Sequence, residues 1–360
     1  MRKKQTGFSL VELMVAALIG LIGTIVIFQV FAVFESQKRA TTSGGDAQSN
    51  LALSMHSVER DVRQAGFGIN DPTFFGCSVN GWDESASGTA FTLPFVPVQI
   101  TQGSATPDPV TGATPQPDTL TVMYGSSSIA HFAPSLNQNL GSATANYRVS
   151  NRHGFELGDV IVLAELRGSP QVPDCILAQV QDLPTSVGNT DSIVHASGTY
   201  DLGGQTTATR FNKAAGIGPN YNFGSTKVFN LGRNPVVNSY TVSNGQLLVQ
   251  PFRGTASPTM DGIVQMQAQY GKDTDGDNIV DAYNDTPPTT PAEWTQVLTI
   301  RVALVARVGQ YEKTDVSPAT LNMWTGGPVW TLSADDRHYR YRILDTIIPI
   351  RNMIWRRSTS

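Results

Sequence analysis

Residues 8–34 read FSLVELMVAALIGLIGTIVIFQVFAVF, an almost unbroken apolar run behind a basic leader, residues 1–7. As a helix rising about 1.5 Å per residue, this run is long enough to cross a hydrocarbon core of roughly 30 Å. Its single charge is Glu12. A carboxylate inside a membrane span costs roughly 2.5–3.5 kcal/mol on insertion scales, so Glu12 is a candidate functional residue.

Two ordinary export signals compete for this stretch. A secretory signal peptide is cut after the apolar run, behind small residues in an A-x-A-like pattern, but here the run ends in bulky residues at Val33 and Phe34. The small residue, Gly7, precedes the run instead. A plain signal anchor would explain the leader and the span, but it would explain neither Glu12 nor the Gly7-Phe8 junction.

The hexapeptide Gly7-Phe8-Ser9-Leu10-Val11-Glu12 resembles the class III signal of type IV prepilins and type II secretion pseudopilins. The resemblance implies that a prepilin peptidase cuts between Gly7 and Phe8 and that the new N-terminus, Phe8, is methylated. It also implies that Glu12 forms an assembly salt bridge with the free amine of a neighbouring subunit. Removal of the leader, with its three basic residues, would take the net charge from −4 to −7.

The helical pattern continues beyond the membrane run. The sequence Thr41-Thr42-Ser43-Gly44-Gly45 predicts a kink or a melted turn, because each glycine weakens a helix by roughly 1 kcal/mol. Apolar residues then return at helical spacing and predict a stripe that faces a core: Leu51, Met55, Val58, Val62 and Ala65. We therefore expect a spine helix with a membrane and assembly half, residues 8–34, and a periplasmic half, residues 35–68.

Residues 69–360 predict a loop-rich, mainly antiparallel β domain, which makes the chain α+β and pilin-like. Charged residues are only 15%, whereas glycine and proline number 33 and 21, a composition that favours β structure over a helical domain. Strands are predicted at 119–124 and 159–164, and a hairpin is predicted over 240–249 around Asn244-Gly245. Alternation over 299–308 predicts one core face and one partly wet face. Residues 100–118 and 184–226 are predicted to be loops.

The chain has two cysteines, Cys77 and Cys175. If the domain is exported, as the basic leader implies, a disulfide between them is the natural state. The alternative, two buried free thiols, remains open because sequence spacing does not prove proximity.

An acidic loop, residues 273–285, has the pattern D-x-D-G-D-x-x-x-D, which is typical of calcium loops in extracellular modules. Asn278, where EF-hands have glycine, tolerates the left-handed conformation. Asn284 or Asp285 would complete the shell, and a solvated acidic loop is the alternative. The predicted Ca²⁺ ligands are the carboxylates of Asp273, Asp275, Asp277 and Asp281 and the carbonyl of Ile279.

Catalysis finds little support in the sequence. The five histidines are scattered without ligand spacing, and no nucleophile elbow, zinc-protease or phosphate-loop motif occurs. We therefore predict that the chain is not an enzyme. It has no global basic excess, which argues against nucleic acid as a partner.

The C-terminal stretch 339–352, which ends in Ile350-Arg351-Asn352, resembles the closing segment of PilW-type minor pilins. That resemblance implies a structural subunit that initiates or caps type IV pilus assembly. The implied partners are other minor pilins, the major pilin, the prepilin peptidase and the inner-membrane assembly platform. The implied location is the inner membrane, single-pass with a periplasmic domain, or the pilus tip. Two alternatives stay open, a type II secretion minor pseudopilin and a membrane-anchored exported adhesin.

Overall fold

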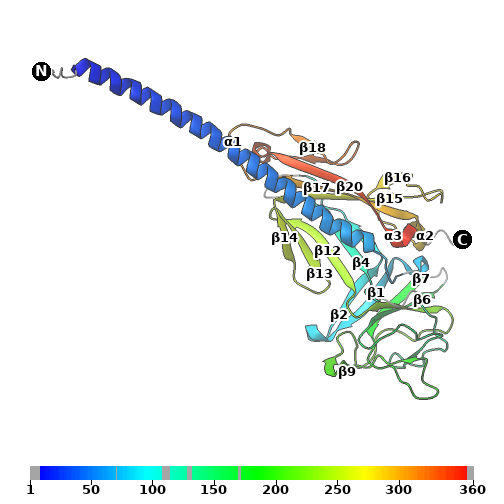
Figure 1. The fold of residues 1–360 in the computed structure, drawn as a ribbon. Coiled ribbons are helices and arrows are strands. Elements are labelled where there is room, and N and C mark those ends of the chain that lie inside the picture. The colour runs from blue at the N-terminus through cyan, green and yellow to red at the C-terminus, as the bar shows by residue number, and fades with distance from the viewer. Residues whose placement is uncertain (1–8, 70, 108–113, 128–131, 169–171, 355–360) are drawn as a thin grey trace.

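A computed structural model describes residues 9–69, 71–107, 114–127, 132–168 and 172–354. Its largest element is helix α1, Leu10–Gln64, which projects as a rod far beyond the globular part (Figure 1). The helix begins with a capping box, in which the Ser9 side chain accepts a hydrogen bond from the Val11 amide and the Glu12 side chain accepts one from the Ser9 amide. This arrangement satisfies amide groups that a helix start otherwise leaves without partners.

Helix α1 runs without interruption through Gly44 and Gly45, so the predicted kink or melted turn is wrong. The hydroxyls of Thr41 and Ser43 donate back to helix carbonyls one turn earlier, those of Gln37 and Arg39. The free-energy cost of the two glycines is small relative to the stability of the whole helix. Helical residues border them on both sides, so the helix only has to continue and does not have to nucleate again. The helix ends at Gln64, slightly before the predicted residue 68.

Three larger sheets form most of the globular part, and their pairs are antiparallel except for the β1–β7 pair. The first sheet has the order β11-β6-β7-β1-β2, with β1 Cys77–Asp83, β2 Thr89–Phe95, β6 Val160–Arg167, β7 Val172–Gln179 and β11 Thr226–Gly232. The second has the order β14-β13-β12-β4-β3, with β3 Val98–Thr101, β4 Thr119–Tyr124, β12 Val236–Ser243, β13 Gln246–Pro251 and β14 Ser257–Asp261. The third has the order β16-β15-β17-β20, with β15 Ile263–Lys272, β16 Ala282–Asn284, β17 Val297–Arg307 and β20 Tyr341–Pro349.

Shorter elements complete the described fold. Three two-stranded ribbons pair β5 Tyr147–Arg148 with β8 Ser192–Ile193, β9 Thr199–Leu202 with β10 Gln205–Ala208, and β18 Thr320–Asn322 with β19 Val329–Thr331. The short helices are α2 Pro291–Gln296, α3 Arg351–Ile354, η1 Pro72–Phe74, η2 Glu84–Ala86 and η3 Asp336–His338. Strands β9 and β10 lie within 184–226, so the prediction of a plain loop there is wrong; the ribbon is exposed and short, and it has no apolar alternation.

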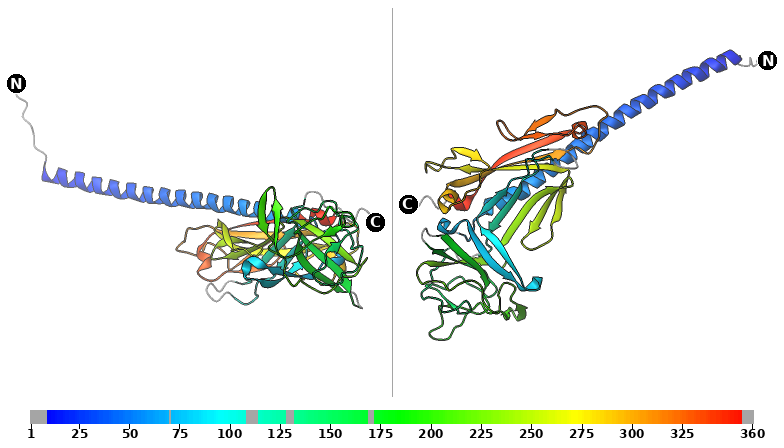
Figure 2. Two further views of the ribbon diagram at one scale, coloured as in Figure 1. Left: turned by 90° about the horizontal axis from the view of Figure 1, so that it is seen from below. Right: turned by 180° about the vertical axis from the view of Figure 1, so that it is seen from behind.

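The second half of α1 packs against the second and third sheets, where it contacts β4, β14, β17 and β20 (Figures 1 and 2). The predicted apolar stripe is the buried face of the helix, with Val58 and Val62 fully buried and Leu51 and Met55 nearly so. Burying each such side chain stabilises the fold by about 1.5–3 kcal/mol. The stripe thus joins the helix to the largest hydrophobic core of the described chain.

The predicted strands are found. Strand β17 has one buried face and one face on which Thr299, Arg301 and Arg307 stay partly exposed, as the alternation predicted. Ala303 and Val305 on the second face pack in a small core with Trp324 and Trp330, which lie in or near the β18–β19 ribbon. The Asn244-Gly245 turn joins β12 to β13 as predicted, and both residues have the positive φ that a type I′ turn requires.

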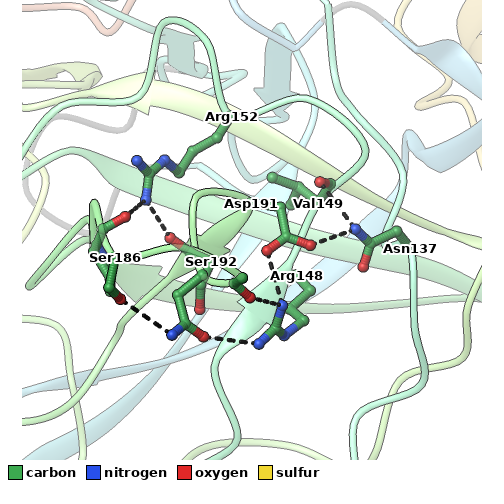
Figure 3. Close-up of polar contacts among 10 residues, drawn as sticks. Asn137, Arg148, Val149, Arg152, Ser186, Asp191 and Ser192 are labelled. Atoms are coloured by element: carbon green, nitrogen blue, oxygen red, sulfur yellow. Dashed lines mark hydrogen bonds and ion pairs between the residues drawn. The ribbon is translucent and has the colours of Figure 1, made fainter.

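The first sheet and the loops on its outer face form a lobe at the end of the molecule opposite the N-terminus (Figure 1). This distal lobe has its own core, which includes Tyr147, Ile161 and Tyr221. Two arginines order its loops: Arg148 binds the Asp191 carboxylate at 2.9 Å, and Arg152 donates to the Pro184 and Ser192 carbonyls (Figure 3).

A buried carboxylate ties the distal lobe to the second sheet. Asp83 at the end of β1 is fully buried and accepts hydrogen bonds from Arg210, at 2.8 and 3.0 Å, and from Arg253 just after β13, at 2.5 Å. The hydrogen bonds from Arg210 hold the pKa of Asp83 well below its usual range. Asp83 therefore stays ionised and cross-links segments that lie far apart in the sequence.

Candidate functional site

The start of α1 is the first predicted site. Gly7 and Phe8, the predicted cleavage and methylation residues, lie outside the described residues. Glu12 is exposed, and within the single chain its carboxylate accepts from the Ser9 amide at 3.0 Å. The neighbour's amine, which the resemblance assigns as its partner, belongs to an assembled state, so this role of Glu12 stays a prediction.

The first half of α1 presents its apolar residues to the outside. Leu10, Phe28 and Phe31 are among the most exposed, at 79%, 73% and 68%. Among the described residues, α1 is the one helix that is long and apolar enough to cross a membrane. Exposure of so many large apolar side chains is unfavourable in water, so this half of the helix requires a lipid or protein environment.

The second half of α1 is held by a buried carboxylate that sequence reasoning missed. Asp61 is fully buried and accepts hydrogen bonds from the Tyr240 hydroxyl at 2.7 Å, the Asn238 amide at 2.8 Å and the Tyr124 hydroxyl at 3.1 Å. These donors lie on β4 and β12. Desolvation, and then the nearby Asp61 charge, raise the pKa of Tyr124 to about 12, so its hydroxyl remains a donor.

The C-terminal signature also acts on α1. The side-chain amide of Asn352 donates to the carbonyls of Gln64 and Ala65, at 3.1 and 3.0 Å. Carbonyls at a helix C-terminus have no partner within the helix, so Asn352 caps the helix from the other end of the chain. The C-terminal motif therefore has a structural role: its Asn352 holds the end of α1 at the junction with the third sheet.

The predicted disulfide is present. Cys77 at the start of β1 and Cys175 in β7 are bonded, with Cα atoms 6.1 Å apart and a separation of 98 positions in the sequence. The bond is buried and lies where β1 and β7 pair in parallel. It thus crosslinks two neighbouring strands of the first sheet, within the distal lobe.

The acidic loop connects β15 to β16, and the structure brings three of its four predicted carboxylates together. Oxygens of Asp273, Asp275 and Asp281 lie within 4.8 Å of one another, with Asp273 buried and the other two exposed. The Thr274 amide and hydroxyl donate to Asp281 and lower its pKa. Asp281 therefore remains ionised and adds negative charge to this group.

The fourth predicted carboxylate, that of Asp277, is not part of this group and accepts from the Ile279 amide at 2.7 Å. The role of the Ile279 carbonyl as a ligand stays a prediction. Asn278 has a φ of 69°, the left-handed conformation predicted for it, and its amide donates to Asp273. Asn284 pairs with Tyr270 on β15, and Asp285 is not part of the carboxylate group. The donor set is oxygen-only, which suits a hard cation.

The sequence did contain a signal for Asp61. It lies three residues after Val58 and directly before Val62, within the predicted buried stripe, and a carboxylate at such a position must find donors. The cap by Asn352 had no such signal, because its partners are main-chain carbonyls that any sequence offers.

Comparison with known families gives two matches, one at each end of the chain. Residues 240–352 match the family described as Type IV Pilus-assembly protein W, and residues 2–28 match the Prokaryotic N-terminal methylation motif. No curated protein and no solved structure matches the chain. Residues 29–239, which include most of the distal lobe, lie outside both matches.

Proposed function

We propose that the chain is a PilW-type minor pilin of the type IV pilus, as its two family matches support. In this role it initiates or caps the fibre as a structural subunit rather than acting as an enzyme. Its N-terminal helix anchors it at a membrane, and its partners are pilus components and the membrane assembly machinery. We propose further that its specific partners are other minor pilins, the major pilin and the prepilin peptidase. We also propose that it resides in the inner membrane and enters the pilus tip.

One observation carries this proposal most directly. The first half of α1 has exposed apolar residues all around it and carries one carboxylate, Glu12, in its first turn. A span of this kind can insert into a bilayer as a single helix, and it can pack against other apolar helices in a fibre. In either place the carboxylate favours a cationic neighbour, because an opposite charge offsets its desolvation.

The proposal predicts that Glu12→Val blocks assembly but not membrane insertion. The substitution removes a costly charge, so the amount of chain in the membrane should hold or rise. Pilus number, counted by electron microscopy, should fall strongly because the contact that recruits the neighbour is lost. Thr24→Val is the matched control, since it removes an uncharged polar group from the same span; Thr24 donates to the Leu21 carbonyl of its own helix.

Both variants should be cut between Gly7 and Phe8, as N-terminal analysis of membrane extracts would show. Normal piliation with Glu12→Val would contradict the assembly role. Loss of type II secretion with intact pili would instead favour the pseudopilin alternative, and a chain with an uncut leader would favour the membrane-anchored adhesin.

We also propose that the acidic loop binds one Ca²⁺ in a structural role. Support comes from the converging carboxylates of Asp273, Asp275 and Asp281 and from the left-handed Asn278 that turns the loop around them. Three carboxylates this close repel one another, and a divalent cation would offset the repulsion. The loop lies at the end of the β15–β16 hairpin, so a bound cation would hold that edge of the third sheet.

We predict that chelation lowers the melting temperature of the protein and that Asp275→Ala removes the response to calcium. A ligand at a hundredfold excess over its Kd stabilises the folded state by about 2.7 kcal/mol. Extracellular modules bind at roughly 10⁻⁴–10⁻³ M, so millimolar calcium should give somewhat less. Asp201→Ala, which removes an exposed carboxylate from the β9–β10 ribbon, is the control and should keep the response. Identical melting curves with and without chelator would contradict calcium binding.

A further inference from the structure

A groove of about 420 Å³ lies on the outer face of β1 and β2 in the distal lobe. Successive residues of a strand point to opposite faces, and on this face Asn80 and Trp82 of β1 stand opposite Thr92 and Ala90 of β2. The rest of the same sheet face, over β6, β7 and β11, is covered by the loops of the distal core. The groove is the part of this face that those loops leave open.

One wall of the groove is a glycine-rich loop, residues 213–218, which is held in place by close packing. A Cβ on Gly218 would lie 2.6 Å from Ile176 of β7, and a Cβ on Gly216 would lie 2.4 Å from the Ala143 carbonyl oxygen. Both glycines also have positive φ. The wall is therefore fitted against the lobe, and its backbone runs along the groove without bulky side chains at these two positions.

Trp82 is the aromatic element of the groove, and its indole is oriented by three contacts. The indole N–H donates to the Glu84 carboxylate at 2.7 Å. Gly88 packs against the ring, where a Cβ would lie 2.7 Å from it. The Lys213 ammonium lies 4.5 Å from the ring centroid. The other described tryptophans, Trp294, Trp324 and Trp330, are buried, so Trp82 is the one that lines an open surface groove.

The chemistry of the groove selects a particular kind of ligand. One cation, Lys213, and one anion, Glu84, flank the indole, so the site favours no net charge. Asn80 and Thr92 offer an amide and a hydroxyl side by side, next to an aromatic ring and the small Ala90. A groove of this volume is within the range of small-molecule sites. A molecule with apolar C–H faces and hydroxyl edges fits all of these groups.

We propose that this groove binds a short, uncharged saccharide. The sugar lies along the β1–β2 face, with a C–H face toward Trp82 after Lys213 swings out, and with hydroxyls on Asn80, Thr92 and the backbone of the glycine wall. Strands β1 and β2 lie in the part of the chain outside both family matches, and the first sheet to which they belong lies away from the exposed half of α1 (Figure 1). The groove would thus add a recognition function to the pilin that the assembly role does not require.

The test uses the full chain in an amine-oxide detergent, because a maltoside detergent carries a sugar of its own. Tryptophan fluorescence and saturation-transfer NMR are recorded with chitotriose, maltotriose and lactose. Chitotriose stands for the N-acetylated sugars of cell-wall polymers, and lactose for galactose-ended glycans of a cell surface. We expect saturable binding of at least one probe, on the order of 1 mM as suits an open groove.

Ala90→Phe fills the groove from an exposed position and should weaken binding about tenfold or more. Ser78→Phe is the matched control, since it places the same ring on the same face of β1 but outside the groove, and it should leave binding unchanged. Thr92→Val should weaken binding several-fold, whereas Lys213→Ala should preserve or strengthen it. The proposal is overturned if no probe binds saturably at millimolar concentration, or if Ser78→Phe lowers affinity as much as Ala90→Phe.

Discussion

Replacing both Cys77 and Cys175 with alanine is expected to lower the free energy of unfolding by roughly 4–5 kcal/mol. In the chain-entropy account, a crosslink that closes a loop of about 100 residues lowers the conformational entropy of the unfolded chain. This raises the free energy of the unfolded state by about 4.7 kcal/mol. The cysteines are 98 residues apart, so the loop is of that size. The folded bond joins β1 to β7, whose pairing is short, and its loss should loosen the distal lobe first.

Urea unfolding of the wild-type and double-alanine chains, followed by far-UV circular dichroism, measures this effect. The reduced wild-type protein is the control, because it keeps the sulfur atoms in the core and lacks only the bond. It should unfold at a urea concentration close to that of the double variant. Equal midpoints for oxidised and reduced wild-type protein would show that the crosslink adds no stability.

Periodicity in the sequence was sufficient to predict the elements of the fold that decide its class. The stripe from Leu51 to Ala65 identifies the buried face of α1, and 119–124 coincides with β4. Both follow from side-chain spacing within one segment. The pairing of Cys77 with Cys175 was predicted from composition and export, and the structure confirms it.

Features that depend on contacts between distant segments could not be predicted in this way. Ala303 and Val305, on the otherwise partly exposed face of β17, are buried because residues in and near the β18–β19 ribbon return to cover them. The continuity of α1 through Gly44-Gly45 reflects cooperativity along the helix rather than the preference of any one residue. At the acidic loop, the backbone turn directs Asp277 toward the Ile279 amide and away from the other three carboxylates.

The junction between α1 and the globular part decides whether the spine and the domain behave as one body. Apolar burial alone would allow the helix to slide along its axis, because such contacts have little directional preference. Asp61, within the apolar stripe, and Asn352, near the C-terminus, add hydrogen bonds that hold the helix at one position along its axis. These hydrogen bonds therefore fix the register of α1 on the globular part.

Asp61→Ala is therefore expected to destabilise the folded chain by about 3 kcal/mol. The variant leaves the half-buried Asn238 amide and Tyr124 hydroxyl without their acceptor. A buried donor left unpaired costs about 1–3 kcal/mol, so each of these two should lie in the lower half of that range. The Tyr240 hydroxyl retains the Ser57 carbonyl, 3.3 Å away, which limits the loss. Arg60→Ala is the matched control on the neighbouring position. Its guanidinium is 3.5 Å from Asp61 and mostly exposed, so it should change stability by less than about 0.5 kcal/mol.

Asp61→Asn separates the charge of this residue from its hydrogen-bonding capacity. The amide oxygen still accepts from one or two of the three donors, so this variant should fall between wild type and Asp61→Ala in denaturant unfolding. Limited proteolysis gives a second readout, because a helix released from β4 and β12 exposes its backbone between residues 47 and 64 to cleavage, while the distal lobe stays resistant. An Asp61→Ala protein with unchanged unfolding and an uncleaved helix would mean that apolar packing alone sets the register of the spine on the domain.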